Sequence, residues 1–136
     1  MNTPKILAPA GDKNSFLAAI AAGADAIYCG LKIFSARMEA DNFSIEELAR
    51  LTRLAKSKRI DVYVAFNSII KESELEKVSR ILNKLCTFVD FDALIIQDPA
   101  MIPLARKAGF TKEFHLSTLG NCTFPLALKT SQQFGF

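Results

Sequence analysis

Short apolar runs alternate along the chain with longer stretches in which apolar residues recur every three or four positions. The short runs are rich in β-branched and aromatic residues and favour strands, whereas the three- and four-residue spacing favours amphipathic helices. Strands are therefore expected at 5–9, 25–30, 61–67, 92–98 and 113–118. Helices are expected from Asp12 or Asn14 to Gly23, from Ser44 to Ala55, and over 72–89, 99–108 and 124–134.

The second and third of these helices have the clearest patterns. Ser44 with Glu47 three places later has the spacing of a capping box, which predicts that the second helix begins at Ser44. Its predicted apolar face is Ile45, Leu48, Leu51, Leu54 and Ala55. The predicted apolar face of the third helix is Leu75, Val78, Ile81, Leu82, Leu85 and Phe88.

Strand followed by helix, five times over, predicts an α/β fold with parallel strands and helical crossovers. We interpret the chain as one partial barrel domain over residues 1–136: the first five βα units of a (βα)8 TIM-type barrel, truncated because a complete barrel needs about 250 residues. A five-stranded flavodoxin-like, doubly wound sheet is the alternative. A dinucleotide-binding fold is disfavoured because the first strand is followed by "APAGDKNS", without GxGxxG.

In either parallel fold the ligand binds at the carboxyl ends of the strands. Alternation places polar side chains on the inward phase of the later strands and large apolar ones toward the helices. His115, the only histidine, is the candidate catalytic acid or base. The candidate ligand-binding residues, which precede or follow strand ends, are Tyr28, Arg37, Asn42, Asn67, Gln97, Asp98, Ser117 and Asn121.

His115 and Ser117 resemble a base beside its nucleophile, but their spacing opposes a direct pair. Two residues apart on a strand, they lie on one face about 6.6–7 Å from each other, which is too far for a Ser–His hydrogen bond. HExxH is absent as well, so a zinc protease is disfavoured. The set suits a polar or anionic ligand, with Arg37 as the partner of an anion.

Composition and charge bear on the partners, the cellular location and the metal content expected of the protein. The net charge is +3 and the basic residues are dispersed, which by itself does not indicate nucleic acid. No signal peptide and no membrane span are expected, so we expect a cytoplasmic protein. Cys29, Cys86 and Cys122 have no close spacing, and we expect three free thiols and no metal site.

Several segments resemble, in order, the N-terminal half of the collagenase-like peptidase family (peptidase family U, number thirty-two). They are "ILAPAG", "AGADAIYCG", "FSAR" with "NF" soon after, "VYVAFN", "DALIIQDP" and "HLST". The resemblance implies a TIM-type barrel and one of two activities. One is proteolysis, including collagen degradation. The other is oxygen-independent hydroxylation of tRNA or rRNA bases or of the ubiquinone ring, in proteins that hold an iron–sulfur cluster with four cysteines.

Two departures from the family pattern matter. The cluster cysteines of the family lie beyond the fifth strand, so no cofactor is assigned within this chain, and the cluster is implied for full-length relatives alone. Family members commonly have Gln after Ser-Thr, where this chain has Leu119.

We therefore expect a fragment of a family enzyme that is inactive alone. A peptidase acting on a protein substrate and a non-catalytic binding module for RNA or another ligand are the alternatives. An open barrel edge is also expected to drive self-association.

Overall fold

The computed structural model describes residues 3–36 and 40–136. Its centre is one parallel sheet of five strands: β1 Leu7–Ala10, β2 Ala26–Gly30, β3 Asp61–Phe66, β4 Ala93–Ile96 and β5 Glu113–Leu116. The helices between and after them are α1 Lys13–Ala21, α2 Ile45–Ser57, α3 Leu75–Phe88, α4 Met101–Lys107 and α5 Pro125–Gln133, with single 3-10 turns at Glu72–Glu74 and Thr118–Gly120. The five predicted strands and five predicted helices are confirmed, with their ends shifted by a few residues.

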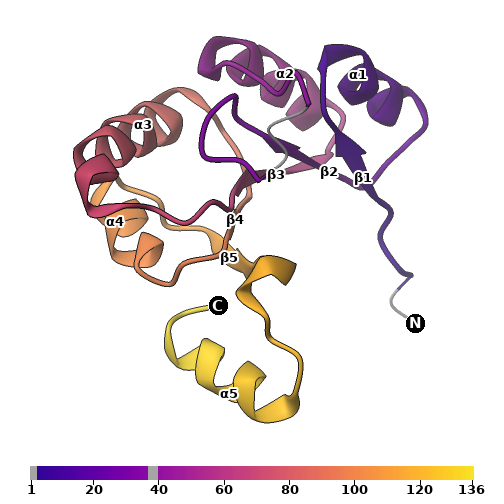
Figure 1. Ribbon diagram of the computed structural model, residues 1–136. Coiled ribbons are helices and arrows are strands. Elements are labelled where there is room, and N and C mark those ends of the chain that lie inside the picture. Colours follow the sequence, from indigo (N-terminus) through magenta and orange to yellow (C-terminus); the bar gives the residue numbers. More distant parts are fainter. Residues whose placement is uncertain (1–2, 37–39) are drawn as a thin grey trace.

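The strands lie in the order in which the chain makes them, β1-β2-β3-β4-β5. Flavodoxin-like sheets have the order 2-1-3-4-5, which this sheet does not have. Its order is that of consecutive units of a barrel. Right-handed crossovers between neighbouring strands place their helices on one face. Figure 1 shows α1 to α4 along the outer side of the curved sheet, with the strands on the inside.

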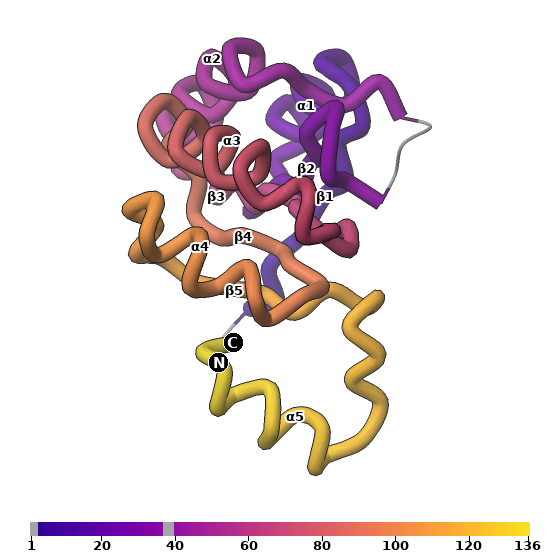
Figure 2. Tube along the Cα trace, turned by 60° about the vertical axis from the view of Figure 1, so that its left-hand side comes forward, coloured from indigo at the N-terminus to yellow at the C-terminus, as the bar shows by residue number. Residues whose placement is uncertain are grey.

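The core lies between the sheet and these four helices. Strand residues of one phase are fully buried there, among them Val62, Val64 and Phe66 of β3, as the predicted alternation requires. The largest fully buried side chains from the helices include Phe16, Leu48 and Leu82. The inner face of the sheet, by contrast, has no helix over it in either view (Figures 1 and 2).

Capping explains where the first two helices begin. Asp12 accepts a hydrogen bond from the Ser15 N–H, and Ser44 accepts one from the Glu47 N–H, with the reciprocal side-chain bonds also formed. The Ser15 N–H holds the pKa of Asp12 below its usual value, and the Ser44 N–H does the same for Glu47. The capping box predicted at Ser44 is confirmed.

The predicted apolar faces are wrong at three positions. Leu54 of α2 and the two end residues of α3, Leu75 and Phe88, are exposed. In α2 Thr52 is fully buried, although Leu54 is exposed. The Thr52 hydroxyl donates to the Leu48 carbonyl at 2.8 Å, so it can be buried without a hydrogen bond to water. In α3 the buried residues are Val78, Leu82 and Leu85, all in the middle of the helix, and the two exposed residues stand at its ends.

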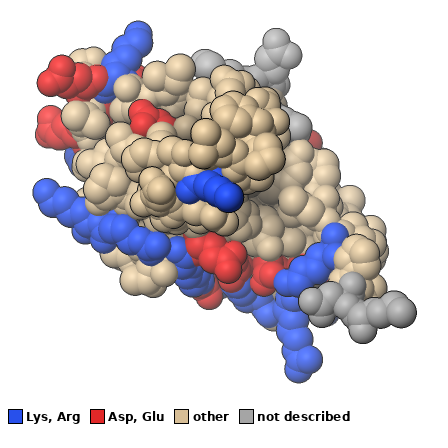
Figure 3. All heavy atoms as spheres, turned by 90° about the horizontal axis from the view of Figure 1, so that it is seen from below, with Lys and Arg blue, Asp and Glu red and all other residues tan. Residues whose placement is uncertain are grey.

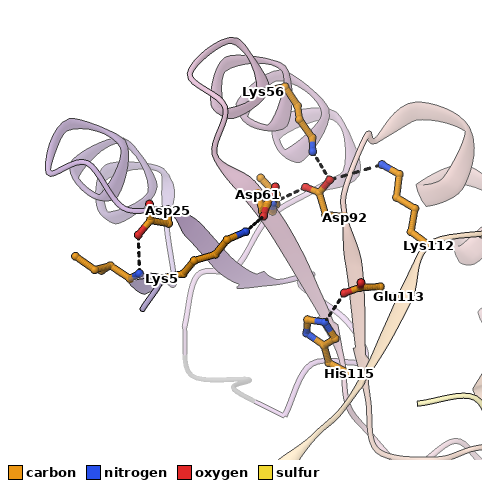
Figure 4. Close-up of polar contacts among 10 residues, drawn as sticks. Lys5, Asp25, Lys56, Asp61, Asp92, Lys112, Glu113 and His115 are labelled. Carbon is orange, nitrogen blue, oxygen red and sulfur yellow. Dashed lines mark hydrogen bonds and ion pairs between the residues drawn. The ribbon is translucent and has the colours of Figure 1, made fainter. Parts of the chain in front are cut away.

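Acidic residues mark the amino ends of the strands (Figure 4). Asp25 accepts from the Ile6 N–H at 2.7 Å, and Asp92 accepts from the Val62 N–H at 2.7 Å and from Lys56. The remaining ion pairs of this edge are Lys5 with Asp61 at 3.1 Å and Lys112 with Asp90 at 2.6 Å and with Asp92 at 3.9 Å. Asp25 thus satisfies the backbone donor just before β1, and Asp92 satisfies one within β3.

The last helix lies apart from the rest. Figures 1 and 2 both place α5 beyond β5, away from the row formed by α1 to α4. None of its residues is buried. None of the helices in the described part of the chain has the length and apolar character that a bilayer span requires.

Candidate functional site

A cavity of about 470 Å³ lies at the carboxyl ends of the strands, on the inner face of the sheet. This volume falls in the range of small-molecule sites. The residues that line it come from all five strands, the loop 31–44 and the turn after β5. They are Leu7, Ala10, Gly11, Tyr28, Cys29, Gly30, Ser35, Ala36, Ala40, Asn42, Ala65, Asn67, Ile95, His115, Leu116, Ser117, Thr118 and Leu119.

The described parts of the loop 31–44 form one wall of this cavity because two glycines let them approach the sheet. The Asn42 N–H donates to the Gly11 carbonyl at 2.8 Å, and the Phe43 N–H donates to the Gly30 carbonyl at 3.1 Å. A Cβ on Gly30 would overlap the Ser35 Oγ and lie 2.9 Å from the Ser35 Cβ, so a side chain at this position would require the loop to shift. Gly30 therefore sets how closely the loop covers the site.

Asn67 holds the same loop from the other side. Its Oδ1 accepts from the Ala36 N–H at 3.1 Å. Next to this bond, Phe34 stacks on Phe66 with ring centroids 5.2 Å apart, and the Lys77 ammonium lies 5.5 Å from the Phe34 ring centroid. The loop is thus attached to β1, β2 and β3 by hydrogen bonds and ring packing.

The Asn67 amide also reaches across the cavity to β5. Its Nδ2 lies 3.4 Å from the Ser117 Oγ, which accepts a further bond from the Leu119 N–H at 3.2 Å. In the described part of the chain the Ser117 hydroxyl accepts both of these bonds, so its own O–H is left to donate into the cavity. Ser117 is buried, at 6% exposure, so a ligand acceptor there would be shielded from water.

His115 has other neighbours than Ser117. Its ring packs edge-on against Tyr63 with centroids 4.8 Å apart, and its Nε2 lies 3.3 Å from the Glu113 Oε2 (Figure 4). Glu113 is two residues earlier on the same strand and therefore lies on the same face. Burial raises the Tyr63 pKa, with the Asp61 carboxylate adding to the shift, so this ring stays a neutral phenol against the imidazole.

Five of the nine predicted site residues meet at the cavity: Tyr28, Asn42, Asn67, His115 and Ser117. Three do not. Gln97 donates to the Leu119 carbonyl at 3.2 Å and, with Asn121, lines a separate groove beside α5. Asp98 accepts from the Ala100 N–H at 2.9 Å and so ends in the turn before α4. Arg37, the ninth, lies outside the described residues.

Several lining residues were not singled out by sequence reasoning. Cys29, Ala36 and Ala40 are small, uncharged side chains, which do not by themselves suggest a binding site. Contacts between a loop and a strand also produce no periodic pattern in the sequence. Burial raises the Cys29 pKa to about 12, so this side chain is a neutral thiol in the wall. Leu119, noted as a departure from the family pattern, does line the cavity.

The three cysteines do not fit an iron–sulfur cluster. Cys29 is buried in β2, Cys86 lies on α3 with a pKa raised by burial, and Cys122 lies in the groove beside α5. Nowhere in residues 3–36 and 40–136 do three His, Cys, Asp or Glu side chains gather as a metal site would require. No step of chemistry in this chain is therefore assigned to a bound metal.

Comparison with known proteins places this arrangement in a family. The sequence pattern described as "Peptidase family U32" matches residues 11–136. An uncharacterized protease of Methanocaldococcus jannaschii is 35% identical over 130 residues, which are 96% of this chain and 31% of that protein. The "tRNA hydroxylation protein P1" of Bacillus subtilis is 33% identical over 115 residues, which are 85% of this chain and 27% of that protein.

A solved structure supports the fold. It is the structure of a U32 peptidase and matches with a TM-score of 0.74 over 99% of this chain and 58% of that chain, at 10% identity. The chain spans about a third of the length of the two curated relatives.

Proposed function

The chain belongs to peptidase family U32, and from this premise we propose that it forms the base-binding part of a longer protein that hydroxylates RNA. One observation carries the proposal: the described lining of the cavity contains no Asp, Glu, Lys or Arg. Enzymes that modify a base take it out of its stack and hold it by hydrogen bonds to its polar edge and by contact with its ring faces. Amide, hydroxyl and aromatic groups in an otherwise apolar cavity suit such a neutral, planar ligand.

Three kinds of group would each contribute to binding the base. The Ser117 hydroxyl donates to a carbonyl or ring nitrogen of the base. Asn67, already held by the Ala36 N–H, fixes the position of that hydroxyl. The rings of Tyr28 and His115 line the same cavity and offer faces or edges for the base.

The names of the relatives support both RNA hydroxylation and proteolysis, and the geometry favours the first. A serine peptidase needs its nucleophile within hydrogen-bond reach of its base. Here the Ser117 Oγ is bonded to Leu119 and Asn67, while the His115 ring is turned to Glu113 and Tyr63. We therefore expect no peptide-bond hydrolysis by this chain.

The proposal for the longer protein extends to its cofactor and its partners. The iron–sulfur cluster that the family resemblance implies would be bound outside this chain, because Cys29, Cys86 and Cys122 do not fit it. RNA would be the macromolecular substrate, in keeping with a cytoplasmic setting. The 136-residue chain taken by itself would associate with another copy through β5, which pairs with β4 alone in the described sheet.

Binding of nucleosides tests the proposal directly. Uridine and cytidine should shift the amide resonances of residues around the cavity in two-dimensional NMR spectra, and their 5′-monophosphates should bind no more tightly. Asn67→Ala should weaken nucleoside binding by about fivefold, the equivalent of one lost hydrogen bond. The matched control is Asn83→Ala, because Asn83 is exposed on α3 and donates to the Ser79 carbonyl.

Absence of any nucleoside-induced shift at the cavity would refute the base-binding proposal. Equal weakening by both asparagine variants would refute the role of Asn67. Gelatin incubated with the chain should stay intact. Cleavage of gelatin that disappears in His115→Ala would instead establish the peptidase alternative.

A further inference from the structure

The helices α2 and α3 bring together basic residues that are far apart in the sequence. Residues 48–60 and 77–89 hold eight of the 17 Lys and Arg residues of the chain and none of its 14 Asp and Glu residues. The two helices pack side by side in the outer row of Figure 1. Charges that are dispersed along the chain therefore lie together in the fold.

The side of the molecule that carries α5 has a different character. Figure 3 views it from below and shows a broad uncharged area, with most Lys, Arg, Asp and Glu side chains around its margin. The basic residues are thus spread unevenly over the molecule, and α2 and α3 hold their largest share. An uneven distribution of this kind creates a local positive potential, which attracts an anionic partner.

Four of the basic residues on these helices have no close anionic partner. Arg50 and Arg53 of α2 and Arg80 and Lys84 of α3 are exposed. None of the ion pairs within residues 3–36 and 40–136 involves them. Arg80 and Lys84 also stand four positions apart on α3, a spacing at which two like charges destabilise a helix. A bound anion would relieve this repulsion.

An exposed aromatic ring ends α3 next to these cations. Phe88 is 64% exposed and lines two grooves, one of about 350 Å³ along α2 and one of about 320 Å³ beside the turn after α4. Arg53 lines both grooves with it, and Arg50 lines the first. Lys84 lies one helical turn before Phe88 and therefore on the same face of α3. We call Arg50, Arg53, Arg80, Lys84 and Phe88 the α2–α3 surface.

The α2–α3 surface does not lie at an edge of the fold. On one side α1 packs against α2, and on the other α4 packs against α3. Both helices therefore have their two neighbours within the chain, in the row that Figures 1 and 2 show. Further βα units of a barrel extend this row past α4 and leave α2 and α3 with the neighbours that they have here.

Single-stranded RNA fits both kinds of group on this surface. Proteins that bind single strands combine a positively charged groove, which follows the phosphates, with aromatic rings on which bases stack. An acidic peptide would use the cations and leave the Phe88 ring without a stacking partner. An apolar protein surface would cover the ring but bury the unpaired guanidinium groups of Arg50 and Arg53, which is unfavourable.

We propose that a single strand of RNA binds along the α2–α3 surface, with phosphates at its four cations and one base stacked on Phe88. This inference rests on the RNA substrate proposed above and names where the strand outside the cavity is held. The loop 31–44, which walls the cavity, leads directly into α2, and Ile45 and Glu46 at the start of α2 line the groove that reaches Phe88. The strand thus runs from the rim of the cavity along α2, over about 20 Å.

Fluorescence anisotropy with a fluorescein-labelled decauridylate measures this binding. The logarithm of the affinity should fall with the logarithm of the salt concentration with a slope of roughly −3, the value for four neutralised phosphates of a single strand. The double variant Arg53→Gln, Lys84→Gln should bind more weakly and reduce the slope to roughly −1.5. The matched control Lys13→Gln, Lys129→Gln removes two exposed cations from α1 and α5 and should change neither the slope nor the affinity.

Phe88→Ala tests the stacked base. Loss of the ring should weaken decauridylate binding by roughly fivefold or more and leave the salt slope unchanged, because stacking does not involve counterions. Inorganic polyphosphate, which carries charge without bases, should bind this variant as it binds the wild type. The matched control is Phe134→Ala, which removes a comparably exposed ring after α5. Circular dichroism confirms that each variant is folded.

The outcomes separate this inference from the proposed function. Equal weakening by the two double variants would overturn the α2–α3 surface as the place where phosphates bind. An unchanged affinity for decauridylate in Phe88→Ala would overturn RNA as its occupant. Nucleoside shifts at the cavity without any decauridylate binding at the α2–α3 surface refute this inference and keep the proposed function. Decauridylate binding that depends on Phe88 without nucleoside shifts at the cavity does the reverse.

Discussion

The two edges of the sheet are built from different chemistry. At the amino edge, Asp25, Asp61 and Asp92 meet lysines and backbone N–H groups, and each strand there begins in a network of charges. At the carboxyl edge the same strands end in glycine, amide and hydroxyl groups around an uncharged cavity. One set of five strands thus carries an ionic edge and a neutral one.

The difference separates two tasks. Charged groups at the amino edge pair with one another and with backbone N–H groups, so they hold the strands together. At the carboxyl edge, Ser117 and Asn67 retain hydrogen-bonding capacity toward the cavity. In barrels the carboxyl face carries the chemistry and the other face carries stability, and the substitutions below are chosen to test that division.

Asp92→Ala should have the largest effect, and on stability alone. It removes the acceptor of the Val62 N–H and the partner of Lys56, so the free energy of unfolding should fall by about 2–3 kcal/mol. Urea denaturation followed by circular dichroism measures this loss. Nucleoside affinity should be unchanged when measured well below the denaturation midpoint. A loss of affinity without a loss of stability would reverse the assignment of the two edges.

Gly30→Ala should affect both properties, because Gly30 holds the loop against the sheet. The new Cβ would meet the Ser35 Oγ at 2.4 Å, so the loop must move and we expect a loss of about 1–3 kcal/mol together with weakened nucleoside binding. Gly11→Ala is the control, since its Cβ would lie 3.3 Å from the Ala40 Cβ and demands a smaller shift. Denaturation and NMR titration of both variants distinguish them. Equal effects of the two glycines would contradict the role of Gly30.

Ser117→Ala should act on binding more than on folding. It removes the O–H that is left to donate into the cavity, at a cost of about 1 kcal/mol in nucleoside binding. Ser117→Thr keeps the hydroxyl and should keep part of the affinity. Isothermal titration calorimetry with uridine compares the three proteins. An unchanged affinity in Ser117→Ala would remove Ser117 from the site.

The smallest effect should come from pH at the amino edge. Lys112 holds the Asp90 pKa below its ordinary value of 3.8, so the carboxylate form is favoured in the folded chain. The resulting stability is present above that ordinary pKa and is lost as the pH falls through the lowered one. Because both partners are exposed, the difference between the wild type and Asp90→Asn should be below about 1 kcal/mol near pH 7 and vanish near pH 2. Thermal unfolding at several pH values measures it, and a difference that grows in acid would contradict the pair.

The sequence was sufficient for the order of elements. Apolar runs and capping residues such as Ser44 are local signals, and they located every strand and helix. Burial at the helix ends was less predictable, because Phe88 fits the period of α3 and yet is exposed. Periodicity assigns a face to a residue, and only the length of the neighbouring elements decides whether that face is covered.

The site was predictable where a side chain follows the strand alternation and not where the chain turns. Asn67 and Ser117 keep the inward phase and line the cavity. Asp98 also follows a strand, but its carboxylate accepts a hydrogen bond from the Ala100 N–H. This bond within the turn holds the side chain away from the cavity. The approach of the loop 31–44 to Gly30 is a contact between segments, and no pattern along the chain encodes it.

The strand order has a consequence for how the molecule is made. Every strand pairs with the one synthesised before it, and Asp25 and Asp92 bind N–H groups of strands that already exist when they emerge. A chain leaving the ribosome can therefore add each βα unit to a finished edge without waiting for a distant segment. Paired residues such as Leu7 with Ala26 and Ala26 with Asp61 are 19 and 35 positions apart, so the entropy cost of loop closure is similar from one unit to the next.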